Sequence, residues 1–235
     1  MDKDFISTVS HELRTPLTSI RGFSQTMLNS WDKLDDDSKK KFLKIIEEQS
    51  NRLINLVENM LSVTKLQSEK ENLIYKETNL RSVIEPVITI IKNTYPKHNF
   101  ILEYNDKTPN IHVDKDKFQQ IMTNLIENAA KYSDENTFIK IKTSPCGDNV
   151  SIKVIDNGIG IDPENYEKIF TKFSRIDNPL TRKVQGSGLG LYITKNLVEK
   201  MGGQISVSSD DNFTIFEILM PIRSVEEQAR VKCNQ

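Results

Sequence analysis

The spacing of the apolar residues changes once along this chain, and that change limits what the chain can fold into. Up to about Leu66, large apolar side chains recur every three or four residues, which is the spacing of an apolar stripe along a helix. After about Leu73 they alternate with polar residues in short runs, which is typical of strands with one buried face. The sequence therefore predicts two domains, an all-α domain followed by an α+β domain.

The first domain, residues 1–68, is predicted to be two long helices joined by a short turn. One apolar stripe runs from Phe5 to Met27 and a second begins at Phe42. Between them the run Asp35–Ser38 offers N-cap residues and negative charge for the start of the second helix. Two such helices cannot bury both stripes against each other, so we expect a homodimer whose helices form a four-helix bundle.

The second domain is predicted to span residues 73–222, after a charged linker at 69–72 and before a flexible polar tail at 223–235. Strands are expected near Phe100–Tyr104, Phe138–Lys142, Val150–Ile155, Gln204–Ser209 and Phe213–Met220. Helices are expected near Leu80–Lys92, Lys115–Tyr132 and Leu189–Met201. These elements predict an α+β sandwich, with helices on one face of a single sheet.

Charge and composition exclude several classes of function. Lys and Arg total 32 against 33 Asp and Glu, so the chain lacks the positive field of a protein that binds nucleic acid or an anionic membrane. No apolar run approaches the roughly 18 residues that cross a bilayer. The two cysteines are too few and too far apart for a disulfide framework or a zinc cluster. We expect a soluble, cytoplasmic segment without nucleic-acid or membrane contacts.

His11 is the candidate nucleophile of the helical domain. It lies beside the apolar stripe, so its imidazole and the carboxylate of Glu12 are expected to face water. A neutral imidazole is nucleophilic near pH 7, and an adjacent carboxylate can accept its other ring proton during attack. Thr15 shares this face and could hold a water or a phosphoryl oxygen, while Pro16 predicts a bend. A solvated histidine without chemical function is the alternative.

A polar helix face in the second domain could hold phosphates and their metal ion. Asn124, Asn128 and Lys131 follow at steps of four and three residues along a predicted helix. An amide oxygen suits a Mg²⁺ ion that keeps several waters, and a lysine supplies positive charge for phosphate. The alternative is an ordinary solvated helix face.

Two glycine-containing segments add to this possible nucleotide site. Asp156 directly follows a predicted strand and could accept a hydrogen bond from an exocyclic amine, while Gly158 and Gly160 allow close backbone approach. The segment Gln185–Leu191 opens a helix whose free amides could hold phosphate. The polar, basic stretch Thr171–Gln185 could be a lid that orders over a triphosphate. An ordinary turn is the alternative for the segment after Asp156.

Taken in chain order, these segments resemble the H, N, first glycine, F and second glycine boxes of sensor histidine kinases. The matching segments are His11–Pro16, Asn124–Tyr132, Asp156–Gly160, Ile169–Phe173 and Gly186–Gly190. The resemblance implies a dimerisation and phosphoacceptor domain, followed by an ATP-binding domain of the type shared with topoisomerases and chaperones. It also implies ATP and Mg²⁺ as cofactors and a response regulator receiver domain as partner, with any sensor or membrane anchor lying upstream.

The resemblance assigns roles to particular residues. His11 would accept the phosphoryl group, Glu12 would be the base, and Asn128 would bind Mg²⁺. Glu12 and Thr15 resemble the E-x-x-T pattern with which such kinases also dephosphorylate their regulators. Asp156 would contact adenine, and Tyr132 would flank the base. The residues expected to bind the nucleotide are Asn124, Lys131, Tyr132, Asp156, Gly158, Gly160, Ile161, Phe173, Arg175, Gly186, Gly188, Leu189 and Gly190.

Two rival functions are disfavoured. ATP-hydrolysing members of the wider superfamily resemble one another in placing a glutamate four residues before the metal-binding asparagine, where this chain has Asn124. An amide cannot take a proton from water, so an ATP-driven conformational machine is a poor fit, and the γ-phosphoryl group should go to His11 instead. A catalytically silent dimeric scaffold that binds a regulator is also disfavoured, because every nucleotide segment keeps its polar side chains.

Overall fold

The computed structural model describes residues 3–67, 73–176, 186–210 and 212–223. The chain divides into two compact units, Met1–Gln67 and Ser68–Gln235. The predicted linker at 69–72 and nearly all of the predicted tail at 223–235 lie outside the described residues, and the predicted domain bounds stay a prediction. None of the described helices combines the length and the hydrophobicity of a bilayer-spanning segment.

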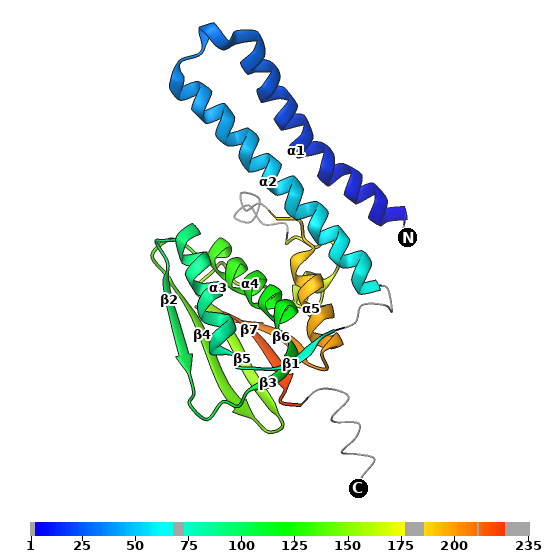
Figure 1. Ribbon diagram of the computed structural model, residues 1–235, viewed down its shortest axis with the longest axis vertical. Helices are drawn as coiled ribbons and strands as arrows, with labels where there is room; N and C mark the ends of the chain where they lie inside the picture. The colour runs from blue at the N-terminus through cyan, green and yellow to red at the C-terminus, as the bar shows by residue number, and fades with distance from the viewer. Residues whose placement is uncertain (1–2, 68–72, 177–185, 211, 224–235) are drawn as a thin grey trace. The chain divides into compact units, whose positions relative to one another are not determined.

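The first unit is the predicted helical hairpin (Figure 1, blue to cyan). Helix α1 spans Lys3–Ser30, a short 3₁₀ turn covers Trp31–Lys33, and α2 spans Asp36–Gln67. The acidic run acts as predicted, because the Asp35 carboxylate accepts a hydrogen bond from the Ser38 amide at 2.7 Å and caps α2. Near the turn the Phe23 and Phe42 rings pack with their centroids 5.1 Å apart.

One hairpin does not bury its whole apolar surface. Met27, Leu56 and Val63 are buried, but Leu17 remains 50% exposed and Leu61 55% exposed. The other large apolar side chains left exposed on the hairpin are Ile6, Leu28, Trp31, Leu43, Ile54 and Val57. The two helices therefore carry more apolar surface than they can cover for each other.

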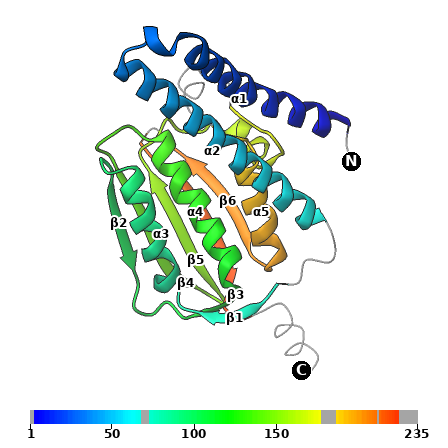
Figure 2. The ribbon, with the colours of Figure 1, turned by 45° about the horizontal axis from the view of Figure 1, so that its top comes forward.

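The second unit is a mixed five-stranded sheet in the order β2-β4-β5-β7-β6, with helices on one face (Figure 2). Its strands are β2 Asn99–Tyr104, β4 Phe138–Cys146, β5 Asn149–Asp156, β6 Gln204–Ser209 and β7 Thr214–Pro221. Its helices are α3 Arg81–Thr94, α4 Lys115–Tyr132 and α5 Gly190–Lys200. Strand β2 runs parallel to β4, and the other neighbouring pairs in this sheet are antiparallel. The predicted helices and strands are confirmed to within a few residues at their ends.

A second, two-stranded sheet was not predicted. Strand β1, Tyr75–Thr78, pairs antiparallel with β3, Ile111–Asp114. Each strand has only four residues, and β1 lacks clean alternation of buried and exposed positions. Strand β3 also leads into α4 without an intervening turn, because Asp114 is both its last residue and the N-cap of that helix. Short strands with weak patterns pair through tertiary context rather than local preference.

Helix α4 fixes the position of the site because its apolar face is the centre of the core. The Asp114 carboxylate caps its start by accepting from the Lys117 amide at 3.1 Å. Phe118, Ile121, Met122, Leu125 and Ile126 are fully buried along its length. Each such side chain contributes about 1.5–3 kcal/mol of hydrophobic stabilisation. The polar residues near the helix C-terminus are thereby held beside the end of β5.

Candidate active site

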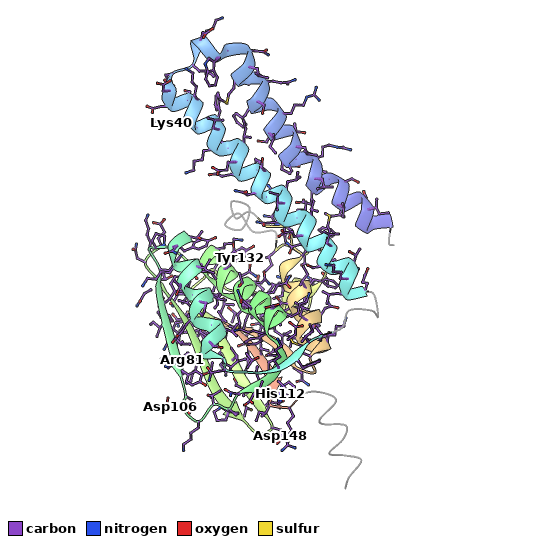
Figure 3. The ribbon with its side chains drawn as sticks, viewed as in Figure 1. Lys40, Arg81, Asp106, His112, Tyr132 and Asp148 are labelled. Carbon is purple, nitrogen blue, oxygen red and sulfur yellow. The ribbon has the colours of Figure 1, made fainter. Side chains whose placement is uncertain are left out.

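A pocket that is open to solvent on one side lies where the end of α4 meets the end of β5. Figure 3 shows Tyr132 at this end of the unit and both His112 and Asp148 at the opposite end. The predicted site residues that line the pocket are Asn128, Tyr132, Asp156, Gly160, Ile161 and Arg175.

Asp156 is a buried carboxylate in this pocket, and its side chain is held in one orientation. The residue is 3% exposed, and its Oδ1 accepts from the Gly158 amide at 2.8 Å and from the Ser133 hydroxyl at 3.3 Å. Burial raises the pKa of Asp156 to about 6, and these two hydrogen bonds offset only part of the rise. Among the described residues both bonds end on Oδ1, so Oδ2 can accept from a ligand.

The backbone beside Asp156 requires glycine at position 158. A Cβ atom on Gly158 would lie 2.5 Å from Asp156 Oδ1 and 2.7 Å from the Tyr132 carbonyl oxygen, which are clashes. The Ile159 amide donates to the same Tyr132 carbonyl at 3.2 Å. Gly160, two residues on, has a φ of +73°. The first glycine segment therefore packs directly onto the end of α4 and forms a wall of the pocket.

The second glycine segment packs behind the pocket rather than lining it. A Cβ atom on Gly188 would lie 2.7 Å from the backbone of Phe173, and one on Gly190 would overlap the Asn124 side chain. Leu189 is fully buried. From this part of the chain the pocket is lined by Leu191, whereas Gly186, Gly188, Leu189, Gly190 and Phe173 are not among the lining residues. Their predicted contacts with a nucleotide stay a prediction.

Asn124 and Lys131 are not among the residues that line the pocket, so their predicted contacts with a nucleotide stay a prediction. The Asn124 amide donates to the Thr194 hydroxyl on α5 at 2.7 Å, and Thr194 is 1% exposed. Four residues make about 400° of helix, so Asn124 is rotated by about 40° from Asn128, which is enough to turn it toward α5. Lys131 forms an ion pair with Glu127 at 2.9 Å.

Tyr132 and Arg175 bring an aromatic ring and a positive charge to the pocket. Burial raises the pKa of the Tyr132 phenol, and the nearby charge of Arg175 offsets part of that rise. The rest of the predicted lid, residues 177–185, lies outside the described residues, and with it the lid residues Arg182 and Lys183.

The sequence did not indicate the apolar walls of the pocket or its two hydroxyl groups, those of Ser174 and Thr214. The missed lining residues are Ala129, Ile159, Ile169, Ser174, Ile176, Leu191, Thr214 and Phe216. In the sequence, these apolar residues look like ordinary core residues of strands and helices. No local pattern therefore distinguishes the ones that line the pocket. Thr214 is placed by sheet register, because it lies directly opposite Asp156 in the β5–β7 pairing.

His11 is exposed on α1, as expected for a phosphoacceptor, but Glu12 is not turned fully to water. The Glu12 Oε2 atom lies 3.4 Å from Nη2 of Arg52 on α2, and both side chains are about one quarter exposed. Such a partly solvated pair is worth about 0–1 kcal/mol, so the carboxylate can leave it at little cost. The Thr15 hydroxyl donates to the His11 carbonyl at 3.4 Å, and α1 continues through Pro16.

Comparison with known proteins identifies the family of each of the two units. Residues 1–69 match the family model of the His Kinase A (phospho-acceptor) domain. Residues 113–224 match that of the histidine kinase-, DNA gyrase B- and HSP90-like ATPases. The two units therefore define a phosphoacceptor domain and an ATP-binding domain. The chain belongs to the sensor histidine kinases of two-component systems and contains their catalytic core.

Curated relatives and solved structures agree with this assignment. The chain is 34% identical over 218 residues to signal transduction histidine-protein kinase ArlS of Staphylococcus haemolyticus, covering 92% of this chain and 48% of ArlS. It is 33% identical over 229 residues to sensor protein kinase WalK of Staphylococcus aureus, covering 96% of this chain and 55% of that protein. The chain thus spans about half the length of these relatives.

Two solved histidine kinases share the fold. Acinetobacter baumannii AdeS superposes with a TM-score of 0.71 at 25% identity, covering 90% of this chain and 98% of that one. Histidine kinase ThkA, solved in complex with response regulator protein TrrA, superposes with a TM-score of 0.75 at 27% identity, covering 94% of this chain and 61% of that one. The predicted fold class, a helical hairpin followed by an ATP-binding α+β domain, is confirmed.

Proposed function

We propose that this chain is an ATP-dependent protein histidine kinase. It binds Mg-ATP in the pocket, transfers the γ-phosphoryl group to His11, and passes that group to an aspartate of a response regulator receiver domain. One observation carries the proposal: a single chain contains an exposed histidine on a phosphoacceptor helix and a buried carboxylate in the pocket of an ATPase-type unit. The proposed domain limits are 1–68 and 73–222, and ATP as substrate favours a cytoplasmic location.

The pocket residues suit an adenine nucleotide. Ionised Asp156 presents Oδ2 as an acceptor for the exocyclic amine of adenine, a hydrogen bond that guanine, with a carbonyl there, cannot make. The ring of Tyr132 flanks the base, and Arg175 supplies positive charge for phosphate. The glycine segment at 158–161 lets the backbone approach the ligand closely. The residues at 186–190 are proposed to support the phosphates through the amides that open α5.

Asn128 is the proposed protein ligand for Mg²⁺. Among the described residues no cluster of three or more His, Cys, Asp or Glu side chains could hold a metal ion alone. One amide oxygen on the pocket wall fits Mg²⁺, because this ion keeps several waters and binds through few protein groups together with phosphates. When bound, the ion neutralises charge on the phosphate oxygens.

The residues around His11 account for the chemical step. A ring nitrogen of His11 attacks the γ-phosphorus, the bond to the bridging oxygen of ADP breaks, and ADP leaves. Glu12 accepts the proton from the other ring nitrogen as the new bond forms. Water does not compete well, because the Asn124 amide is no base and is engaged with Thr194.

The proposed active form is a homodimer. Leu17, Leu61 and the other exposed apolar residues of the hairpin are the surface that a second hairpin would cover in a four-helix bundle. The receiver domain is proposed to dock on the same helices near His11.

Incubation with γ-labelled ATP tests the proposed function. The protein should become labelled in a form that is labile to acid and stable to base, as expected of a phosphorylated histidine. The label should then move to a receiver domain offered from a panel of candidates. ATP turnover without a phosphorylated protein would instead identify a conformational ATPase, and failure to bind ATP would identify a scaffold.

Replacing Asn128 with alanine should reduce autophosphorylation by about a hundredfold or more, because the metal loses its protein ligand. The measurement is the initial rate of labelling at fixed Mg²⁺ and ATP. The Asn99→Ala variant removes an exposed amide on β2 and should label normally. Dimerisation should be unchanged in both variants, and a monomeric Asn128→Ala protein would mean that Asn128 has a structural role.

Replacing Thr15 with alanine should leave autophosphorylation within about twofold of wild type and reduce phosphatase activity by roughly tenfold or more, because Thr15 is proposed to orient the attacking water. Release of phosphate from a phosphorylated receiver domain is the measurement. Thr64→Ala is the matched control, since Thr64 also donates to the carbonyl four residues earlier, on α2. Unchanged phosphatase activity in Thr15→Ala would remove this role.

The affinity for ATP should fall as the pH drops through about 6. Burial raises the pKa of Asp156 to about 6, and a protonated carboxyl no longer offers a full acceptor to the adenine amine. Titration calorimetry with Mg-ATP from pH 5 to 8 measures this dependence. A binding constant that is flat across this range would show that ionised Asp156 does not contact the base.

A further inference from the structure

The loop that follows Asp156 forms one wall of the nucleotide pocket without regular secondary structure. Ile159, Gly160 and Ile161 all line the pocket. At its first end the loop is held by the bond from the Ile159 amide to the Tyr132 carbonyl. Its second end needs a separate anchor, because Gly160 adopts a left-handed φ and allows the chain to change direction between the two ends.

The side chain of Ser209, the last residue of β6, supplies that second anchor. Its hydroxyl oxygen accepts from the Ile161 amide at 3.2 Å and donates to the Phe213 carbonyl at 3.2 Å. A Cβ atom on Gly160 would lie 3.3 Å from the same oxygen, so the loop rests directly on Ser209. One hydroxyl thus joins the pocket loop to the connection between β6 and β7.

Tyr166 in turn holds Ser209 in place by bonding to both the amide and the carbonyl of its backbone. The Tyr166 hydroxyl accepts from the Ser209 amide at 2.7 Å and donates to the Ser209 carbonyl at 3.3 Å. Tyr166 lies just after the 3₁₀ turn Pro163–Asn165, downstream of the pocket loop. The loop therefore meets the end of β6 twice, first through Ile161 and then through Tyr166.

We propose that Ser209 is a positioning residue of the nucleotide pocket, which fixes the Gly160–Ile161 wall, and that Tyr166 fixes Ser209 in turn. This inference rests on the proposed function, because it assigns the support of the proposed ATP site. Ser209 does not touch the reacting atoms. It acts by holding the Gly160–Ile161 wall in its binding conformation before the nucleotide arrives, so that the loop loses little conformational freedom on binding.

Two variants test this role in the 235-residue chain. Ser209→Ala removes the anchor of the Ile161 amide, and Tyr166→Phe removes both bonds to the Ser209 backbone. The controls are Ser208→Ala, at an exposed neighbouring position on β6, and Tyr192→Phe, on α5. Hydrogen exchange of the Ile161 amide reports on the anchor directly, and calorimetry with a non-hydrolysable Mg-ATP analogue reports on the pocket.

Ser209→Ala should speed exchange of the Ile161 amide and weaken nucleotide affinity by about fivefold, the change that loss of one ordinary hydrogen bond produces. Tyr166→Phe should shift both quantities in the same direction. The KM for ATP should rise while kcat for His11 labelling at saturating ATP is retained, a split that a merely structural role would not give. Both controls should match the wild type.

Two results would overturn the role of Ser209 while leaving the proposed function intact. One is wild-type affinity and wild-type Ile161 exchange in both variants. The other is a loss of kcat that parallels a lower melting temperature of the unliganded protein, with KM unchanged. If the wild-type protein itself binds no ATP, the proposed function fails and this inference fails with it.

Discussion

The His11→Ala protein should take up no label from ATP, a loss of at least about a thousandfold in autophosphorylation, because no other group replaces the nucleophile. Its affinity for Mg-ATP should be unchanged, since the described residues that line the pocket all belong to the other unit. Labelling followed by mass spectrometry of the wild type should place the phosphoryl group on His11.

The His112→Ala protein is the control for this experiment. His112 lies on β3, at the end of the second unit opposite Tyr132 in Figure 3. It should label like the wild type. Equal labelling of His11→Ala, or a phosphorylated residue elsewhere in the wild type, would defeat the proposed mechanism while leaving ATP binding in place.

The Asp156→Asn protein should lose ATP affinity by about a hundredfold or more, because an amide nitrogen takes the place of the acceptor that reads the adenine amine. Calorimetry with Mg-ATP measures the loss. Asp148→Asn removes the same formal charge at an exposed position at the opposite end of the unit and should bind normally. Tight ATP binding by Asp156→Asn would show that the base is read by another group.

The same Asp156→Asn substitution should stabilise the unliganded protein at pH 8. Burial raises the pKa of Asp156 from 3.8 to about 6, so the folded protein prefers the neutral carboxyl. The stabilisation from that preference is complete below pH 4 and is lost as the pH rises through about 6. A neutral asparagine avoids this loss, so its free energy of unfolding at pH 8 should exceed the wild-type value by on the order of 1–3 kcal/mol.

Denaturant unfolding at pH 8 and pH 4 separates this effect from a general change in packing. The gain in Asp156→Asn should shrink toward zero at pH 4, where the wild-type carboxyl is also neutral in the folded protein. ATP should reduce this gain at pH 8, because the wild type binds the ligand more tightly and therefore gains more stability from it. A variant that is less stable at both pH values would mean that Ser133 and Gly158 require a carboxylate as their acceptor.

The sequence by itself determined the longer helices and strands and the chemical groups that the chain carries. The spacing of apolar residues within a short stretch of sequence distinguishes a helix from a strand. For this reason α2, α4 and β5 were predictable from local pattern. The same is true of the motif residues, because His11, Asn128 and Asp156 are identified by their neighbours in the chain. The four-residue strands were missed because they contain too few positions for a period to show.

Tertiary structure alone decided which of these groups meet. Helix rotation turned Asn124 toward Thr194 and left Asn128 on the pocket wall. Packing of the hairpin brought Arg52 to Glu12, 40 residues away in sequence. Sheet register placed Thr214 opposite Asp156. Each outcome depends on the rotation or register of an element against a distant partner, and a one-residue slip or a fraction of a turn changes it without altering the local pattern.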